Sequence, residues 1–293
     1  MKTIGVIGLG SIGMRHAKNL KAMGHNVIGF DPIAVGDGFA SIWPIRRLDE
    51  LDAIVIASPT HKHYEHIHAC GVRPFLVEKP IAHTISDGLL LSRSVAECVV
   101  GYNLRFHGCV KKAKEWLDSG KIGDPIWANF TLGQHSEKPP YLRDGVILNW
   151  SHEIDLALYL LGPAGVASSI TRVRDGNDYM TDIILLQERA DGHKVSTTIH
   201  LDYLTAPEQR YFTITGTKGR IFMDVAAWTG SLISPGWEED FDLRNKDWNQ
   251  TYIEEMQAFL DRIDGKETIG CTGEEGLEVL KICLEVRKQA GLP

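Results

Sequence analysis

Several features that define other classes of protein are missing from this chain of 293 residues. No apolar run approaches the roughly 20 residues that a membrane-spanning helix needs, and no apolar signal-peptide core precedes a cleavage site near the N-terminus. Positive charge is not in excess, because 38 acidic side chains outnumber 31 basic ones and leave a net charge of −7. A general nucleic-acid binder would need a basic surplus to neutralise phosphates. These absences predict a soluble, acidic, cytoplasmic protein.

The cysteines also lack a pattern, since the five are odd in number and form no C-x-x-C pair. We expect reduced and mostly buried thiols, as in a cytosolic protein. The positions are Cys70, Cys98, Cys109, Cys271 and Cys283. The rest of the composition is ordinary, with 43% hydrophobic residues, and the length predicts about two domains.

The most informative stretch that is present covers residues 4–16, IGVIGLGSIGMRH. A β-branched run breaks there into Gly8-Leu9-Gly10-Ser11-Ile12-Gly13. In a dinucleotide site the first glycine permits a tight turn, the second lets a pyrophosphate approach the backbone, and the third lets the helix pack close to the sheet. The phosphates then lie on the N–H groups of a helix N-terminus. We therefore expect a dinucleotide site, the alternative being a purely structural turn.

Asp31 indicates which dinucleotide would bind. It ends the next predicted strand, eighteen residues beyond Gly13, where a carboxylate can accept both hydroxyls of an adenosine ribose. The same carboxylate repels a 2′-phosphate, and the following residues, Pro32-Ile33-Ala34, offer no basic side chain to receive one. NAD(H) is therefore expected in preference to NADP(H).

The first 120 residues alternate predicted strands and helices, which is the pattern of a parallel sheet covered on both faces. The expected strands are Thr3–Ile7, Asn26–Phe30, Ala53–Ala57, Phe75–Val77 and Cys98–Tyr102, and the expected helices are Ser11–Met23, His61–Cys70, Ser86–Ala96 and Asn103–Ser119. The intervening segment Pro32–Asp52 is expected to be a compact loop.

Beyond residue 120 the pattern changes to β-rich runs separated by turn sequences. The expected strands are Pro125–Gln134, Val166–Val173, Thr181–Glu188, Lys194–Leu201, Tyr211–Thr215 and Arg220–Asp224, and the helices are His152–Leu161, Trp248–Asp264 and Gly273–Ala290. We expect an α/β protein with a doubly wound parallel sheet over residues 1–120. An α+β domain with a mostly antiparallel open sheet should follow over residues 121–293, and its last helices are candidates to pack back on the first domain.

Two segments carry candidate catalytic groups. Glu78-Lys79-Pro80 follows the fourth predicted strand, where open α/β sheets bind ligands. A lysine ammonium there could stabilise a developing alkoxide, the alternative being an ordinary surface lysine. His152 lies in the first turn of a helix, with Ser151 as its expected N-cap and Asp155 three residues on. The helix dipole favours a neutral imidazole, which can act as a base, although a structural histidine is the plainer reading.

The run of histidines from His61 to His68 suggests a metal site only weakly, because zinc needs about four ligands and no partner cluster is evident. We expect no metal, and instead a solvated helix with one or two residues beside the cofactor, His63 among them.

These motifs together resemble the glucose–fructose oxidoreductase / inositol dehydrogenase family (Gfo/Idh/MocA). The resemblance extends over essentially the whole chain, and Glu-Lys-Pro with the histidine helix is more specific than the glycines. It rests on the glycine motif, Ser58-Pro59-Thr60, Glu78-Lys79-Pro80, the Ser-His-Glu-Ile-Asp helix ending in Leu161-Gly162, and Gly216-Thr217-Lys218-Gly219.

The resemblance implies a Rossmann domain joined to an open sheet domain whose exposed face often mediates dimers or tetramers. It implies NAD-dependent hydride exchange with a hydroxyl or ketone carbon of a sugar, cyclitol or nucleotide sugar. Lys79 would polarise the reacting oxygen and His152 would be the acid/base, with Asp155 and Asn149 as further catalytic candidates. The cofactor candidates are Gly8, Leu9, Gly10, Ser11, Ile12, Gly13, Asp31, Pro32, Ser58, Pro59, Thr60, His63, Glu78 and Lys79. The substrate candidates are Asn103, Arg105, Tyr141 and His152.

One position departs from the family pattern. Many relatives carry an aspartate three or four residues before the histidine, where this chain has Asn149 and Leu148. We expect His152 to be a weaker base than in those relatives, or Asp155 to supply the missing charge. Two other functions stay open, a bilin- or imine-type reductase and a non-catalytic NAD(H)-binding regulator. The presence of both Lys79 and His152 favours an enzyme, since a sensor needs no acid–base pair.

Overall fold

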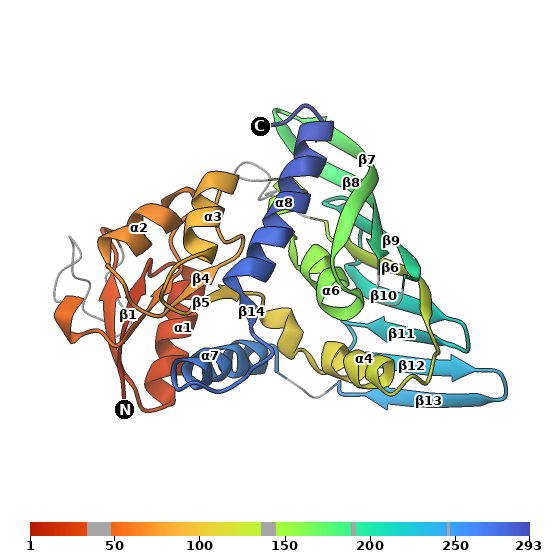
Figure 1. Ribbon diagram of the computed structural model, residues 1–293, viewed down its shortest axis with the longest axis horizontal. Helices are drawn as coiled ribbons and strands as arrows, with labels where there is room; N and C mark the ends of the chain where they lie inside the picture. Colours follow the sequence, from red (N-terminus) through yellow and green to blue (C-terminus); the bar gives the residue numbers. More distant parts are fainter. Residues whose placement is uncertain (34–47, 136–144, 189–191, 245–246) are drawn as a thin grey trace. The chain divides into compact units, whose positions relative to one another are not determined.

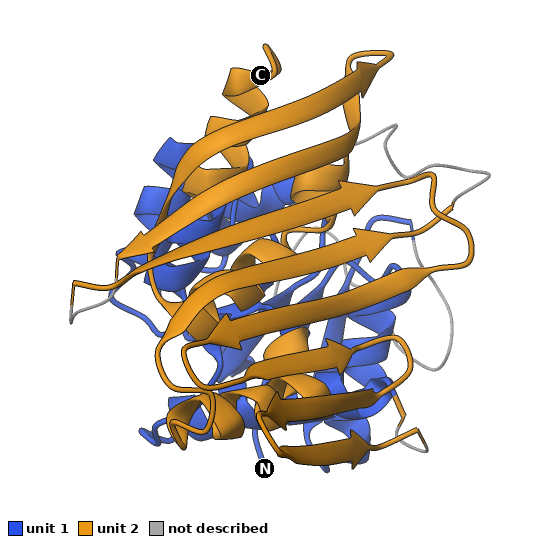
Figure 2. Ribbon diagram, turned by 90° about the vertical axis from the view of Figure 1, so that its right-hand side faces the viewer, with its two compact units in different colours: residues 1–103, 248–280 blue, residues 104–247, 281–293 orange. Residues whose placement is uncertain are grey.

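The computed structural model describes residues 1–33, 48–135, 145–188, 192–244 and 247–293. These residues form two compact units, which are residues 1–103 with 248–280 and residues 104–247 with 281–293 (Figure 2). In this division residues 104–120 belong to the second unit. The domain boundary at residue 120 that the sequence suggested remains a proposal. Along the described ranges, no helix is both long and apolar enough to cross a membrane.

The first unit is built on a six-stranded sheet in the order β14-β5-β4-β3-β1-β2. Five strands are parallel to their neighbours and β14 is antiparallel to β5. The strands are β1 (Thr3–Ile7), β2 (Asn26–Phe30), β3 (Ala53–Ile56), β4 (Phe75–Glu78), β5 (Cys98–Gly101) and β14 (Cys271–Thr272). The strand order reverses at β1, which lies between β2 and β3. Open sheets bind their ligands at the carboxyl ends of the strands at such a switch point.

The helices of this unit lie along the sheet (Figure 1). They are α1 (Ser11–Ala22), α2 (His63–Ala69), α3 (Ile85–Ser92), α7 (Asn249–Ile263) and the first part of α8 (Gly273–Gln289), with short 3-10 turns η1 (Leu48–Glu50) and η2 (Thr60–Lys62). Met256, Phe259 and Leu260 follow helical spacing on α7 and join one apolar core with Ile4 of β1 and Leu20 of α1. Helix α7, which comes late in the chain, therefore completes the apolar core beside α1.

The second unit contains an eight-stranded sheet in the order β13-β12-β11-β10-β6-β9-β8-β7. Only β6 and β9 pair in parallel; the other neighbours are antiparallel. The strands are β6 (Pro125–Gly133), β7 (Ala164–Arg174), β8 (Asn177–Glu188), β9 (Lys194–Asp202), β10 (Gln209–Gly216), β11 (Arg220–Asp224), β12 (Thr229–Ser234) and β13 (Trp237–Asp242). Burial alternates along β8, β9 and β10, so one face of the sheet is covered and the other is solvated.

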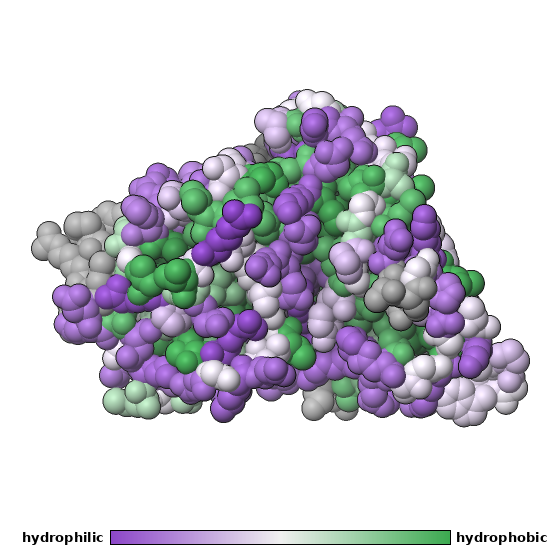
Figure 3. All heavy atoms as spheres, viewed as in Figure 1, coloured by the Kyte–Doolittle hydropathy of each residue, from purple (hydrophilic) through white to green (hydrophobic). Residues whose placement is uncertain are grey.

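Three helices pack on the covered face: α4 (Gly108–Asp118), α5 (Gly145–Asn149) and α6 (His152–Leu161). Figure 2 looks onto the opposite face, which no helix of the described residues crosses. Both hydrophilic and hydrophobic residues reach the surface of the side shown in Figure 3. All five cysteines are buried and no disulfide joins them.

The fold class expected from the sequence is confirmed, but one expected helix is divided and several elements were missed. The single helix expected over 103–119 is divided into η3 (Asn103–Phe106) and α4. His107 interrupts it because its backbone is extended and its side chain accepts a hydrogen bond from the Cys109 amide, as an N-cap does. The strands β12 and β13 and the short helix α5 were not expected at all.

Candidate functional site

The turn after β1 has no room for a side chain at two of its glycines. Gly8 has φ of +87°, and a Cβ there would lie 2.7 Å from the Ala57 carbonyl. A Cβ on Gly13 would lie 1.8 Å from the Gly8 oxygen. At Gly10, by contrast, a Cβ would meet nothing within 4 Å. Gly8 and Gly13 therefore serve the packing of the turn itself, whereas Gly10 keeps an approach to the backbone open.

The N-terminus of α1 is suited to an anionic group. Gly10 is its N-cap and supplies no side chain to the amides of the first turn. Gly10 and Ser11 are exposed, and Ile12 is partly exposed. Uncapped amides and the positive end of a helix dipole bind phosphate readily. The turn thus fits the pyrophosphate of a dinucleotide.

Asp31 lies at the end of β2, as the sequence predicted, and contacts the glycine turn. Its Oδ2 accepts a hydrogen bond of 2.7 Å from the Leu9 amide, and its Oδ1 accepts one of 2.8 Å from the Ile33 amide. Pro32 is exposed beside it. The carboxylate therefore stabilises the turn and stays partly exposed at the same sheet edge.

The turn after β3 is held by a histidine of α2. The Nε2 of His63 lies 3.0 Å from the Ser58 carbonyl oxygen, and its Nδ1 lies 3.3 Å from the Ile81 carbonyl oxygen. Burial lowers the pKa of His63, so its ring is expected to be neutral and to donate from one nitrogen only. His63 thus connects the Ser58–Thr60 turn with the segment that follows Lys79 and Pro80.

Glu78 and Lys79 lie at the end of β4. The Glu78 side chain is 16% exposed, and its Oε1 lies 2.7 Å from the Nε2 of His16 on α1. Lys79 is partly exposed and precedes a cis peptide bond to Pro80. Because β1 to β4 are parallel, the cofactor candidates of the first unit all come together at the carboxyl edge of one sheet.

His152 begins α6 in the second unit, but the local structure differs from the expected isolated helix start. Only two residues separate α5 from α6, and the side chain of Ser151 makes no capping hydrogen bond. The Ser151 carbonyl instead accepts the Asp155 amide at 2.9 Å. Ser151 therefore occupies the N-cap position, as the sequence predicted, but its side chain caps no amide of α6, and its own backbone is helical.

Asp155 and Arg105, which the sequence assigned to different roles, bind each other. The Arg105 Nη2 lies 2.6 Å from Asp155 Oδ1, and its Nε lies 3.1 Å from both carboxylate oxygens. The two side chains are 0% and 2% exposed, and the Arg105 guanidinium stacks 4.8 Å over Tyr159. Removing one member would leave a buried unpaired charge, which typically costs about 3–5 kcal/mol. The Asp155 charge is thus compensated by Arg105.

Two other predicted residues have identified partners. Asn149 donates to the Tyr203 hydroxyl at 3.0 Å in the second unit. Asn103 is buried in the first unit and donates to the Thr251 hydroxyl at 2.8 Å. Tyr141, the remaining substrate candidate, lies outside the described residues.

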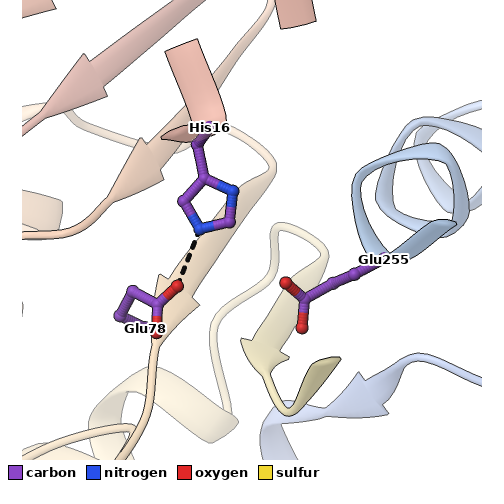
Figure 4. A group of neighbouring side chains, drawn as sticks. All are labelled: His16, Glu78 and Glu255. Atoms are coloured by element: carbon purple, nitrogen blue, oxygen red, sulfur yellow. Dashed lines mark hydrogen bonds and ion pairs between the residues drawn. The ribbon is translucent and has the colours of Figure 1, made fainter. Parts of the chain in front are cut away.

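Sequence reasoning missed two buried charged contacts near these segments. Glu153, next to His152, accepts a hydrogen bond of 2.7 Å from Arg210 on β10. His16, Glu78 and Glu255, drawn in Figure 4, each offer one possible metal-ligand atom, and these atoms lie within 4.8 Å of one another. Among the described residues, this is the one group that could hold a metal ion. The spacing of His16 after Gly13 was a local signal that could have been noticed, but Glu255 lies too far along the chain. The expected lack of a metal stays a prediction.

Family models match both parts of the chain. Residues 110–222 match the GFO/IDH/MocA C-terminal domain, and residues 1–69 match the NAD binding domain of D-isomer specific 2-hydroxyacid dehydrogenases. The chain is 24% identical to myo-inositol 2-dehydrogenase of Thermotoga maritima over 322 aligned residues, which cover 97% of this chain and 95% of that protein.

Solved structures share the fold along nearly the whole chain. An oxidoreductase from Agrobacterium radiobacter, in complex with NAD⁺, L-tartaric acid and magnesium, has a TM-score of 0.85 at 21% identity and covers 99% of this chain and 96% of its own. UDP-N-acetylglucosamine 3-dehydrogenase from Acidithiobacillus ferrooxidans has a TM-score of 0.82 at 21% identity, with 98% and 97% covered.

Proposed function

Because this chain belongs to the Gfo/Idh/MocA family of dehydrogenases that act on CH–OH groups, we propose that it exchanges a hydride between NAD(H) and a carbon of a sugar, cyclitol or nucleotide sugar. The observation that carries the proposal is the glycine turn after β1. Gly10 leaves the backbone accessible, while Lys79 follows β4 at the same edge of the sheet. A myo-inositol dehydrogenase and a nucleotide-sugar dehydrogenase among the similar proteins support the substrate class.

The residues present fit NAD(H). Gly10 and the first turn of α1 would hold the pyrophosphate, and the partly exposed Asp31 would accept ribose hydroxyls. When bound, the cofactor supplies the hydride acceptor or donor at C4 of its nicotinamide. The Ser58–Thr60 turn, His63 and Glu78 are proposed to line the nicotinamide side.

Lys79 and His152 are proposed to handle the proton of the reacting hydroxyl. The Lys79 ammonium would donate a hydrogen bond to the reacting oxygen and stabilise negative charge as the hydroxyl loses its proton. The His152 imidazole would accept that proton during oxidation and return it during reduction. Asp155 and Arg105 are proposed to hold α6 in place for this step rather than to contact the proton, because they are buried against each other.

The Asp31 carboxylate is expected to set the preference for NADH over NADPH. Asp31→Asn keeps an oxygen that can accept the Leu9 amide but removes the charge that repels a 2′-phosphate. The affinity ratio should shift toward NADPH by about tenfold, as measured by nucleotide fluorescence. Asp52→Asn is the matched control, since Asp52 also accepts a backbone amide, that of Thr3, at 2.7 Å. A ratio that changes equally in both variants would remove Asp31 from cofactor selection.

Asn149→Asp tests whether this position is coupled to the proposed base. A carboxylate beside His152 would favour the imidazolium, so the acidic limb of the pH–rate profile should move up by about one pH unit. Asn129→Asp is a matched control, because Asn129 likewise donates to a hydroxyl, that of Thr198, at 2.9 Å. An unchanged profile in Asn149→Asp would mean that residue 149 does not act on the base.

The direct test of the proposed function is NADH absorbance after mixing the protein and NAD⁺ with free and nucleotide-linked sugars, cyclitols and uronates. The double variant Lys79→Ala, His152→Ala is run beside it. Turnover that the double variant lacks would identify the substrate class. If no compound is turned over although NADH binding is measured separately, a bilin- or imine-type reductase or a non-catalytic regulator would be favoured.

Two further proposals concern the oligomeric state and the cellular location. The chain is proposed to form a homodimer or homotetramer through the solvated face of its eight-stranded sheet. Exposed apolar side chains on this face support an interface there: Trp127, Ile170, Ile184 and Leu186. The cytoplasmic location stays a prediction.

A further inference from the structure

Helix α5, which comes just before the helix of His152, is too short to be stable by itself. It has five residues, whereas isolated helices shorter than about 12–15 residues are marginal in water. Residues 145–148 are buried, and the amides of a first helical turn have no partner within their own helix. The position of α5 therefore depends on contacts with other parts of the second unit.

Asp178, on β8, supplies an acceptor for this first turn. Its Oδ2 accepts a hydrogen bond of 2.8 Å from the Ile147 amide, and its side chain is 0% exposed. Gly145 permits the close approach, because its φ is +67° and a Cβ there would lie 2.2 Å from Asp178 Oδ1. Asp178 thus acts on α5 as an N-cap side chain does, although it lies 31 residues beyond Ile147.

Arg287, in the last turn of α8, holds the same carboxylate. Its Nη1 lies 2.7 Å from Asp178 Oδ1, and the two side chains are 7% and 0% exposed. The Arg287 Nε also donates to the Pro293 carbonyl oxygen at 3.0 Å. Cys283, one helical turn earlier on α8, lies with its Sγ 3.8 Å from the Ile147 carbonyl oxygen. Two contacts, one direct and one through Asp178, therefore join α8 to Ile147.

Backbone hydrogen bonds continue from α5 into α6. The Trp150 amide donates to the Val146 carbonyl oxygen at 2.9 Å, and the Trp150 carbonyl oxygen accepts the Glu153 amide at 3.3 Å. His152 lies within this run and is partly exposed. A displacement of α5 would therefore be passed on to the His152 ring.

We propose that Asp178 and Arg287 are positioning residues for His152, with Asp178 holding the first turn of α5 through the Ile147 amide and Arg287 fixing Asp178. Proton transfer needs a base within hydrogen-bond reach of the reacting hydroxyl, and a misplacement of about 1 Å can cost about 10²-fold in rate. The inference rests on the proposed function, since it is there that His152 is the acid/base. It gives α8 a part in supporting the site.

Two double variants that share Arg287→Gln test the contact with Ile147. Asp178→Asn keeps an oxygen for the Ile147 amide, and Asp178→Ala removes it. Both double variants lack the whole ion pair, so neither buries an unpaired charge. Asp178→Asn, Arg287→Gln should keep kcat within about threefold of the wild type. Asp178→Ala, Arg287→Gln should lower kcat by about tenfold, with KM and the NADH affinity within about twofold.

The same changes in a His152→Ala background separate positioning from a general loss of structure. If Asp178 acts through His152, Asp178→Ala, Arg287→Gln should cost less than about twofold there, because residues that act as a unit are not additive. A tenfold loss in both backgrounds would overturn the proposal. Wild-type kcat in the folded Asp178→Ala, Arg287→Gln variant, or a tenfold loss in Asp178→Asn, Arg287→Gln, would overturn it as well.

NMR of labelled histidine rings gives a second readout that needs no substrate. The chain has 12 histidines, and the signal that disappears in His152→Ala belongs to His152. This signal should shift or broaden in Asp178→Ala, Arg287→Gln and match the wild type in Asp178→Asn, Arg287→Gln. An unchanged signal in both would overturn the positioning role.

The two readouts also keep this inference apart from the proposed function. If no compound is turned over, or if His152→Ala keeps full activity, the proposed function fails, and the ring spectrum still decides whether Asp178 holds His152 in place. Chemical denaturation checks that each variant is folded. If Asp178→Ala, Arg287→Gln is not, Asp178→Leu, Arg287→Met removes the same acceptor while filling the space, and the same results support or overturn the proposal.

Discussion

Lys79→Ala and His152→Ala are each expected to lower kcat/KM by about 10²–10⁴-fold while the affinity for NADH falls at most a few-fold. General acid–base groups contribute rate factors of this size, because they act on charge that develops only in the transition state. The double variant should lose little more than the worse single variant, since two groups that move one proton act as a unit. Steady-state kinetics on the substrate found in the panel, together with NADH fluorescence, measures both quantities.

Surface residues of the same types provide the controls for this prediction. Lys62 pairs with Glu65 on the surface, and His68 is exposed at the end of α2. Lys62→Ala and His68→Ala should leave kcat/KM within about twofold of the wild-type value, because exposed surface charges contribute little to stability. If Lys79→Ala costs no more than Lys62→Ala, the reacting oxygen is polarised by another group. If His152→Ala keeps full activity, the histidine of α6 is structural.

Gly10→Ala is expected to weaken NADH binding, whereas Gly13→Ala is expected to destabilise the fold. A methyl group on Gly10 meets nothing within 4 Å, so stability should change by less than about 0.5 kcal/mol. The same methyl would occupy the approach of the pyrophosphate and weaken NADH binding by about 10–100-fold. A methyl on Gly13 would lie 1.8 Å from the Gly8 oxygen, and Gly13→Ala should therefore destabilise the fold by about 3 kcal/mol or more.

Chemical denaturation and NADH titration of both variants separate these two effects. Gly165→Ala is the matched control, because this glycine of β7 also has open space around its Cβ position and lies far along the chain from the turn. It should leave both stability and NADH affinity unchanged. Wild-type NADH affinity in Gly10→Ala would mean that the glycine turn is structural and that the dinucleotide binds elsewhere.

The elements that the sequence predicted best are those with purely local signals. The structure has β1 at Thr3–Ile7 and β2 at Asn26–Phe30, with the predicted bounds, because each is a short apolar run that ends at a turn or a polar residue. Buried parallel strands read as continuous apolar runs, and this makes them visible in one chain. By contrast, β12 and β13 were missed. Strand β12 consists largely of small and polar residues, and the edge strand β13 carries exposed acidic residues.

The residues of the candidate site likewise include some with a local sequence signal and some without one. The glycines, Asp31, the Ser58 turn and Glu78-Lys79 were recognised because each follows a strand, and the parallel sheet then brings those strand ends to one edge. The partners of several site residues were not recognisable. Arg105 and Asp155 are 50 residues apart, and each alone resembles a helix-start charge. Their pairing changes the expected role of both.

The sequence by itself determined the family and the fold class and predicted the glycine turn after β1, because these depend on short-range patterns of glycine, apolar and charged residues. Only the tertiary structure decided which charges compensate each other. Glu78 meets His16 across 62 residues, and Glu255 reaches the pair from a helix near the other end of the chain. The physical reason is that the cost of burying a charge depends on what folding places beside it, and that neighbour is set by the packing of distant segments.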